Sequence, residues 1–361
     1  MRMSEVIVQS AAAALRLQRP DGSFPPGRNG PYRDTDTPVR NTAHWLISLL
    51  KAHEIAHATA FRDAAARAAN YLTTPELRPG GATFLCRTGS SKSASNGLIG
   101  QAWVIEALCT ASSALGEPRY RELATAVFLL HPFDDEAGLW RIRDVDGRCG
   151  GYDWTFNHQL WFAAVGVAIG GTSSVCTTQA QRFLDCAQTR HLRVRAGCIS
   201  HRFPAPHRLQ RHPIRHLRSL LRFRCPRQWM TRQEVGYHAF NLYGLALLKQ
   251  RFPFHPLWAQ PKLALVLRFP KSDTYLQALE QNEYGYSYNP VGFEVALALQ
   301  VFEPWDTDSA SWWVTHQISR TYDHQQNVMR LGGGDPVTLA ARLYEACRLQ
   351  DVALRLPPSA E

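Results

Sequence analysis

Six times along the chain a short polar cluster precedes an apolar stretch of helical length, and a more charged, amphipathic segment lies between successive stretches. A helix that is apolar all round is buried, whereas a helix with a single apolar face borders solvent. The alternation therefore predicts a ring of helical hairpins with buried inner helices and partly exposed outer helices. The predicted inner helices cover residues 40–54, 97–114, 157–169, 236–250, 291–303 and 336–348.

The charged segments between these stretches predict the outer layer of the ring, and Pro270 is expected to break its fifth helix. The predicted outer helices cover residues 4–18, 58–73, 117–130, 176–188, 257–281 and 307–322. The chain is thus predicted to be all-α, with one domain over residues 1–361. Inner helices of such a ring run parallel, so their polar N-terminal ends meet at one end. The loops that lead into them are rich in glycine, proline and aromatic residues, which predicts short β-hairpins around a cleft there.

The positive charge is concentrated in one segment. The net charge is +10, and residues 190–232 contain 12 arginines and five histidines but no acidic residue. We predict that residues 190–233 form an Arg/His-rich insertion between the third and fourth helical hairpins. Within it, IRHLRSLLRFR has apolar side chains at helical spacing and arginines between them, a pattern typical of helices that lie on an anionic membrane surface.

This insertion indicates an anionic partner. An anionic oligo- or polysaccharide, free or lipid-linked, is one candidate, and peripheral contact of residues 190–232 with an anionic membrane is another. A solvated loop is the alternative. Nucleic acid is not expected to bind, because no recognition motif accompanies the charge. The sequence does not predict the oligomeric state.

No uninterrupted run of 18 apolar residues occurs, and the N-terminus lacks the apolar core of a signal peptide. The eight cysteines are scattered without CxxC spacing, which predicts free thiols and neither a disulfide framework nor a metal site. We therefore expect a cytoplasmic protein, peripheral to the inner membrane if the insertion binds lipid, that uses no metal and no cofactor.

The polar clusters carry a family resemblance. The segments TPVRNTAHWLI, NGLIGQAWVIEAL, FNHQLWFAA, YHAFNLYGLALLK and YGYSYNPVGFE resemble the AglQ-type proteins of glycan-biosynthesis gene clusters. The resemblance implies an (α/α)6 toroid of the carbohydrate-active enzyme class. The Asn157–His158 pair also resembles the Asn-His element of toroidal uronate lyases and epimerases, which implies that a uronate-containing glycan is the substrate.

Asn157 and His158 are the predicted catalytic pair. Removal of the C5 proton of a uronate needs a base that titrates near neutral pH, and an unperturbed histidine has a pKa of about 6.5. The Asn157 amide can donate a hydrogen bond to the substrate carboxylate and stabilise the enolate that forms. The resemblance implies a tyrosine or second histidine as the acid on the other face. The candidates for that acid are Tyr237, His238, Tyr243, Tyr286 and Tyr288. The alternative is that His158 only caps its helix or makes a core hydrogen bond.

The other polar clusters supply predicted substrate-binding residues. Arg40 and His44 are one helical turn apart and share a face, and a planar guanidinium can bind a carboxylate through two hydrogen bonds. An ion pair of Arg40 with Asp34 or Asp36 is the alternative. Amide and aromatic side chains can bind sugar hydroxyls and sugar faces. The complete predicted binding set is Arg40, Asn41, His44, Asn96, Gln101, Trp103, Trp161, Asn241, Tyr243, Tyr286 and Asn289.

Carboxylates near the same clusters support a competing hypothesis, glycoside hydrolysis by a pair of acids. Glu294 is the best single candidate, and Asp36 and Asp153 also lie near helix starts. Asp335 precedes a proline and is predicted to be a helix N-cap. No pairing of carboxylates stands out, so proton abstraction, by a lyase or an epimerase, is the favoured reaction. A toroid that binds a glycan without turning it over is the third possibility.

Overall fold

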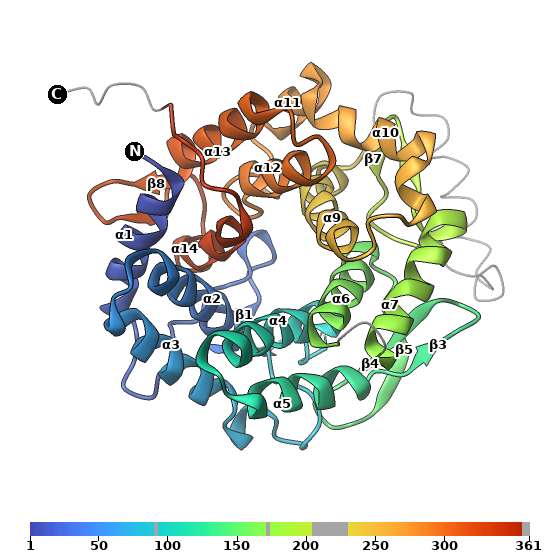
Figure 1. Cartoon of the computed structure of the whole chain (residues 1–361). Coiled ribbons are helices and arrows are strands. Elements are labelled where there is room, and N and C mark those ends of the chain that lie inside the picture. Colours follow the sequence, from blue (N-terminus) through green and yellow to red (C-terminus); the bar gives the residue numbers. More distant parts are fainter. Residues whose placement is uncertain (90–92, 171–173, 204–229, 356–361) are drawn as a thin grey trace.

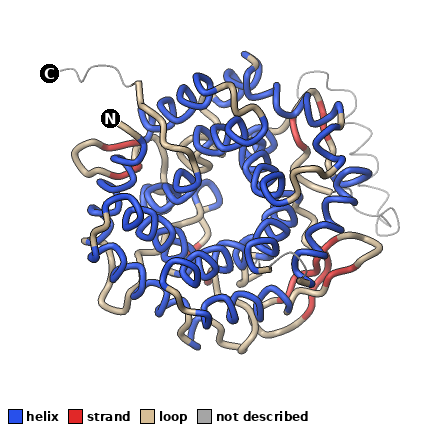
Figure 2. Tube along the Cα trace, viewed as in Figure 1, coloured by secondary structure: helices blue, strands red, loops and turns tan. Residues whose placement is uncertain are grey.

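The computed structural model describes residues 1–89, 93–170, 174–203 and 230–355, and the helices of these segments form two concentric layers that close into a ring (Figures 1 and 2). Each inner helix packs against the next, and the last of them contacts the first. The inner layer consists of α2 (Val39–Ala56), α4 (Gly97–Leu115), α6 (Phe156–Ile169), α9 (Arg232–Arg251), α12 (Val291–Phe302), and the pair α14 (Pro336–Ala341) and η7 (Arg342–Arg348). This arrangement confirms the predicted toroid.

Each outer helix covers an inner one. The outer layer consists of α1 (Met3–Leu15), α3 (Thr59–Leu72), α5 (Pro118–Leu129), α7 (Val175–Cys186), the pair α10 (Pro261–Arg268) and α11 (Asp273–Leu279), and α13 (Thr307–Thr321). The fifth outer helix is interrupted where Pro270 was expected to break it. The 3-10 turn η6 (Phe269–Lys271) separates its halves, and Ser272 caps the second half by accepting a hydrogen bond from the Tyr275 amide.

Burial follows the sequence pattern that predicted the two layers. On α3 the buried residues recur every three or four positions, from Phe61 to Leu72, so one face packs inward and the other meets solvent. On α4 nearly every residue is buried. Among the described helices, α4 alone has the length and apolar composition of a membrane span, and 78% of that stretch is buried inside the ring, as expected for a core helix.

Short strands surround the end of the ring where the inner helices begin. β1 (Thr35–Asp36) pairs with β2 (Arg87–Thr88), which joins the loops before α2 and α4. The other pairings are antiparallel: β3 (Phe133–Asp134) with β4 (Leu139–Arg143) and β4 with β5 (Cys149–Tyr152), β6 (Val194–Arg195) with β7 (Cys198–Ile199), and β8 (Tyr322–Asp323) with β9 (Val328–Met329). The remaining turns are η1 (Gly30–Tyr32), η2 (Pro75–Leu77), η3 (Ala187–His191) and η5 (Pro256–Ala259). The prediction of short hairpins at the rim is confirmed.

Asp335 closes the ring at this end. One oxygen of its carboxylate accepts the Thr338 amide at 3.2 Å, which makes Asp335 the N-cap of α14, as predicted. The other oxygen accepts the backbone amides of Arg28 and Gly30 at 2.8 and 2.9 Å. The loop before α2 is therefore anchored to a residue about 300 positions later in the chain.

The described part of the Arg/His-rich insertion consists of residues 190–203, which carry β6 and β7, and residues 230–233, which include the start of α9. β7 packs against α9. The predicted amphipathic segment IRHLRSLLRFR lies outside the described residues.

Candidate functional site

A cavity of about 180 Å³ opens at the end of the ring where the inner helices begin. Polar side chains from most of the predicted clusters line it, so these clusters do converge. The predicted site residues in its wall are Asn96, Trp103, Asn157, His158, Tyr237, Tyr288 and Asn289. The residues in its wall that were not predicted include Asn29, Tyr32, Arg87, His201, Arg202, Gln233 and Arg342.

His158 lies in the first turn of α6 and is held by a buried aspartate. Its Nδ1–H donates to Asp153 Oδ2 at 2.8 Å, and its side chain is 24% exposed. Since Nδ1 is occupied by Asp153, the lone pair of a neutral His158 is on Nε2. An aspartate in this position fixes the tautomer and orientation of the imidazole and stabilises the imidazolium that forms on protonation.

Asp153 is itself fixed by backbone amides. Its carboxylate accepts hydrogen bonds from the amides of Leu98, at 3.2 Å, and Thr155, at 3.2 Å. Burial by itself raises the pKa of Asp153, but His158 and these two amides together bring the pKa below its usual value. Gly97 permits the approach of the carboxylate to α4, because it has a φ of +62° and a Cβ there would lie 2.6 Å from Asp153 Oδ2.

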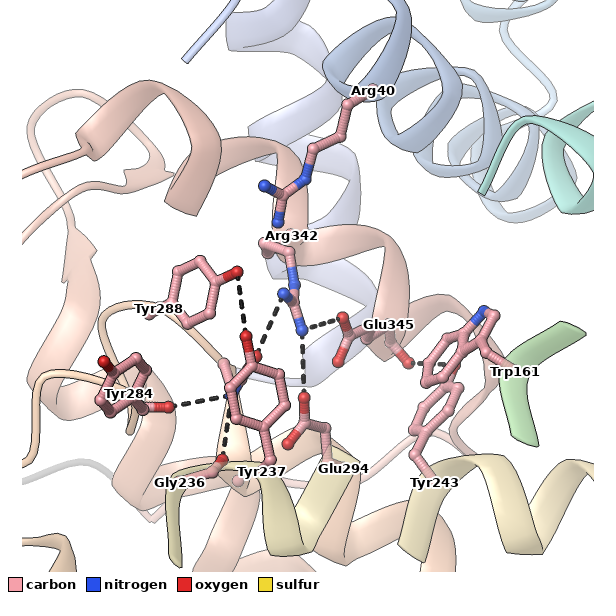
Figure 3. Close-up of polar contacts among 12 residues, drawn as sticks. Arg40, Trp161, Gly236, Tyr237, Tyr243, Tyr284, Tyr288, Glu294, Arg342 and Glu345 are labelled. Carbon is pink, nitrogen blue, oxygen red and sulfur yellow. Dashed lines mark hydrogen bonds and ion pairs between the residues drawn. The ribbon is translucent and has the colours of Figure 1, made fainter. Parts of the chain in front are cut away.

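A chain of tyrosine hydroxyls lines the same cavity. Tyr237 Oη lies 3.0 Å from Tyr32 Oη. It also lies 3.3 Å from Tyr288 Oη (Figure 3). The Tyr288 hydroxyl donates to Asn29 Oδ1 at 3.0 Å, and the Gln233 amide donates to Tyr32 Oη at 2.7 Å. Burial raises the pKa of Tyr237 well above its usual value, so this hydroxyl keeps its proton and can donate it.

His201 is a second histidine in the cavity wall, and it comes from the strand-bearing part of the insertion. Its ring centroid lies 4.7 Å from that of Tyr237. Burial lowers the pKa of His201 to about 3, with a further contribution from nearby His158. His201 is therefore neutral at physiological pH. The sequence did not single it out, because it lies in a run of basic residues that resembles an exposed surface.

Arg40 and His44 lie behind the cavity wall. Arg40 forms the ion pair with Asp36 that the sequence offered as the alternative, at 3.6 Å, donates to Asn29 at 2.8 Å, and lies over Trp103, 4.3 Å from the ring centroid. Burial raises the pKa of Asp36 to about 6, with Arg40 acting in the opposite direction. His44 is fully buried and stacks on Tyr344, and burial lowers its pKa well below the usual value. The prediction that Arg40 and His44 contact substrate directly is corrected: they support the wall.

Glu294 is also placed away from the cavity. Its carboxylate is fully buried and pairs with Arg342 Nη2 at 3.1 Å, and Arg342 is the residue that reaches the cavity (Figure 3). Arg342 also donates to Asn289 Oδ1 at 3.3 Å. The amide of Asn289 donates in turn to the backbone oxygens of Gly236 and Tyr284, both at 3.0 Å. The interpretation of Glu294 as a catalytic acid is therefore corrected, and Asn289 ties the loop before α12 to α9.

Three predicted residues on α9 point elsewhere. His238 accepts the Ile199 amide at Nδ1 and donates from Nε2 to the Val266 carbonyl oxygen, so it joins α9 to the outer layer. Asn241 donates to the Tyr237 carbonyl oxygen within the helix, and Tyr243 donates to the Glu345 carbonyl oxygen. None of these three side chains lines the cavity, and the predicted roles of His238 as acid and of the other two in substrate binding are corrected.

Three more predicted residues make contacts inside the protein and do not line the cavity. Asn41 donates to the Pro25 carbonyl oxygen at 2.9 Å. The ring of Trp161 stacks with those of Phe240 and Tyr243 on α9, and its Nε1 donates to Glu106 Oε2 at 3.4 Å. Tyr286 packs edge-on against His316 of α13. Their predicted contact with substrate is corrected in the same way.

Gln101 holds a rim loop. Its amide oxygen accepts the Phe84 amide at 2.8 Å, and its nitrogen donates to the carbonyl oxygens of Phe84 and Ser95 at 3.1 and 2.8 Å. Gln159 of α6 repeats this pattern, bonding the amide and carbonyl of Trp140. Gln101 thus bonds the backbone of a rim loop, as Gln159 bonds the backbone of β4, and the predicted contact of Gln101 with substrate is corrected.

We therefore expect Gln101→Met to destabilise the protein. The change leaves the Phe84 amide and two carbonyl oxygens buried without partners, and the free energy of unfolding should fall by about 2–4 kcal/mol. Urea unfolding followed by circular dichroism measures this difference. Gln325→Met is the control, since the Gln325 side chain is exposed. Equal unfolding midpoints for the two variants would contradict the proposed role of Gln101.

No family model matches the sequence. The chain is 41% identical over 367 residues to archaeal glycosylation protein Q of Haloferax volcanii, an alignment that covers 98% of this chain and 99% of that protein. The match thus extends over the inner helices, the outer helices and the rim.

Solved structures share the ring. A D-mannose isomerase superposes with a TM-score of 0.66 at 12% identity, covering 96% of both chains. Cellobiose 2-epimerase from Spirochaeta thermophila gives 0.62 at 15% identity over 95% of both chains. An unsaturated glucuronyl hydrolase specific for heparin gives 0.60 at 11% identity over 96% of this chain and 94% of the other. At these identities the likeness shows the fold alone, the (α/α)6 toroid of carbohydrate-active enzymes.

Proposed function

The chain belongs to the family of archaeal glycosylation protein Q, and we propose that it processes a uronate-containing glycan by abstracting the C5 proton of the sugar. The observation that carries this proposal is the Asp153–His158 pair in a cavity that also holds a chain of tyrosine hydroxyls. A positioned base and a neutral acid in one cavity are what proton transfer at carbon requires. The glycan is free or lipid-linked.

The proposed reaction begins at His158. Its Nε2 takes the C5 proton, and the electron pair of the C–H bond passes into the substrate carboxylate, giving an enolate. Asp153 stabilises the imidazolium. The amides of Asn157 and Asn96 and the guanidinium of Arg202 line the cavity and can stabilise the enolate oxygens.

Two outcomes follow from this enolate. Proton delivery to C5 from the tyrosine chain inverts the carbon, which is epimerisation; His158 then returns its proton to solvent and the tyrosine regains one. Departure of the oxygen substituent at C4, with a proton supplied by a tyrosine hydroxyl or by His158, gives an unsaturated sugar, which is elimination. Both outcomes use the same base, and the products distinguish them.

Glycoside hydrolysis has less support from the geometry. Hydrolysis needs two carboxyl groups that face the scissile bond. Among the described residues that line the cavity, Asp34 is the only carboxylate, and it forms an ion pair with Arg87 at 3.1 Å. Asp153 is engaged by His158, and Glu294 is buried beneath the wall.

Product analysis tests the proposal. Incubation with glucuronate-containing oligosaccharides in D2O should place deuterium at C5, seen by NMR, or produce the ultraviolet absorbance of an unsaturated uronate. New reducing ends without unsaturation would instead indicate a hydrolase. Binding without any chemical change, across a panel of free and lipid-linked uronates, would indicate a glycan-binding protein and would exclude the proposed reaction for that panel.

We expect Tyr237→Phe to impair the acid step. The variant keeps the ring but removes the central hydroxyl of the chain, so kcat should fall about 10²-fold or more with little change in KM. Steady-state kinetics measures the effect, on whichever glucuronate-containing oligosaccharide the product analysis shows to be a substrate. Tyr286→Phe is the matched control, because Tyr286 lies outside the cavity wall. An unchanged kcat in Tyr237→Phe would remove this hydroxyl from the mechanism.

A further inference from the structure

Two buried carboxylates beneath the cavity share one guanidinium. Arg342 Nη2 lies 3.1 Å from Glu294 Oε1 and 2.6 Å from Glu345 Oε1 (Figure 3). The exposed fraction of the side chain is 1% for Arg342 and zero for both glutamates. The cluster joins α12 to η7, far from water.

The charges of this cluster do not balance if both glutamates are ionised. One positive charge would face two negative ones, and an uncompensated buried charge is strongly unfavourable. A single proton restores neutrality, and an oxygen of each carboxyl group lies against the same nitrogen, Arg342 Nη2. Burial raises the pKa of both Glu294 and Glu345 above the usual value, and the charge of Glu345 raises that of Glu294 further.

The groups around the cluster supply no further positive charge. Tyr344, beside Glu345, and Tyr275 of α11 are fully buried, and burial keeps the pKa of both phenols well above the usual value, so they are neutral. Glu106 of α4 is paired with Arg348 at 2.7 Å. Tyr243 of α9 is neutral for the same reason as the other phenols.

The remaining neighbours on α2 and in the loop before α12 are also balanced. Arg40 is paired with Asp36, and His44 is held neutral by burial. The ring of Tyr288 lies 5.8 Å from the Arg342 guanidinium and contributes no formal charge. Among the described residues, the balance of the cluster therefore depends on a proton.

The cluster acts on the cavity through Arg342, which lines it and donates to Asn289. We propose that Glu294 and Glu345 share a single proton, and that this proton keeps the cavity floor from carrying a net negative charge, so that a carboxylate-bearing sugar can bind above it. The part of this inference that concerns the sugar rests on the function proposed above. Loss of the proton as pH rises places a negative charge beneath the substrate carboxylate, which weakens binding.

The experiment compares the wild type with Glu294→Gln, in which an amide replaces the protonated carboxyl group. Calorimetry measures the Kd of methyl glucuronoside and of the uncharged methyl glucoside as a function of pH. Infrared spectroscopy of the same proteins detects the carbonyl stretch of a buried carboxylic acid. Glu106→Gln is the matched control, because Glu106 is equally buried but already balanced by Arg348.

We expect the wild type to lose about tenfold in affinity for the glucuronoside as the pair deprotonates, and Glu294→Gln to lose much less. Affinity for the glucoside should not follow this pH dependence. The carboxylic acid stretch should be present in the wild type and in Glu106→Gln, and absent from Glu294→Gln.

The outcomes separate the two proposals. An identical loss of affinity with rising pH in the wild type and Glu294→Gln, or no carboxylic acid stretch that depends on Glu294, would overturn the shared proton and leave the proposed function standing. A Glu294-dependent stretch combined with no binding of glucuronoside at any pH would support the shared proton and overturn the choice of a uronate as substrate.

Discussion

Replacement of His158 by alanine is expected to lower kcat by about 10²- to 10⁴-fold, the usual contribution of a positioned general base. The loss should appear in kcat more than in KM, because in the proposed mechanism His158 removes the reacting proton, whereas Asn96, Asn157 and Arg202 still line the cavity. The fold should persist, since the His158 side chain is partly exposed and its removal opens no cavity in the core. Rates of C5 deuterium exchange measure the base step alone.

The control for this experiment is His324→Ala, which removes an exposed histidine on the β8–β9 hairpin. Its kcat and thermal midpoint should match those of the wild type. A His158→Ala enzyme that exchanges the C5 proton at the wild-type rate would show that the base lies elsewhere, and His201, the other histidine in the cavity wall, would become the candidate.

Replacement of Arg342 by methionine is expected to have the largest effect on stability. The change leaves Glu294 and Glu345 buried with no positive partner, and removal of one member of a buried ion pair costs about 3–5 kcal/mol of unfolding free energy. The folded-state pKa of both glutamates is raised, so the folded protein favours their protonated forms. The destabilisation should therefore be smallest at low pH and grow as pH rises through their folded-state pKa values.

Urea unfolding as a function of pH measures this effect. The triple change Arg342→Met, Glu294→Gln, Glu345→Gln is the control, because it removes all the ionisable groups together and should recover most of the lost stability. If Arg342→Met alone is as stable as the wild type at neutral pH, the cluster is not an ion pair of the kind described.

The helical ring could be predicted because the burial of each helix determines its pattern of apolar and polar residues. Stretches such as LYGLALL and VALALQVF carry no polar face, which only an inner helix tolerates, and Pro270 marks a break that no continuous helix could contain. These signals depend on residues within one or two helical turns of each other. They do not depend on how distant segments meet.

The direction of single side chains was harder to predict, because consecutive residues of one helix face different neighbours, about 100° apart. The fourth inner helix was expected to start at residue 236, but α9 starts at Arg232, one turn earlier. His238 therefore lies deeper in the helix than expected, and its side chain bonds Ile199 and Val266, whereas that of Tyr237 reaches the cavity. His158, in the first turn of α6, lines the cavity.

The composition of the rim loops predicts a cleft, but it does not show which loop residues reach the cavity. Tyr32 and Asn29 lie in a loop whose position is set by Asp335, and His201 reaches the cavity because β7 packs on α9. Both contacts join segments far apart in the chain, so local composition contains no trace of them.

The anchor that Asp335 provides has a consequence for how the cavity forms during synthesis. The loop that carries Asn29 and Tyr32 leaves the ribosome about 300 residues before its carboxylate anchor. A nascent chain that has formed five of the hairpins still lacks the Arg342 beneath the cavity and the bond that orders this loop. The cavity is therefore completed only when the sixth inner helix docks, although most of its wall residues are synthesised earlier.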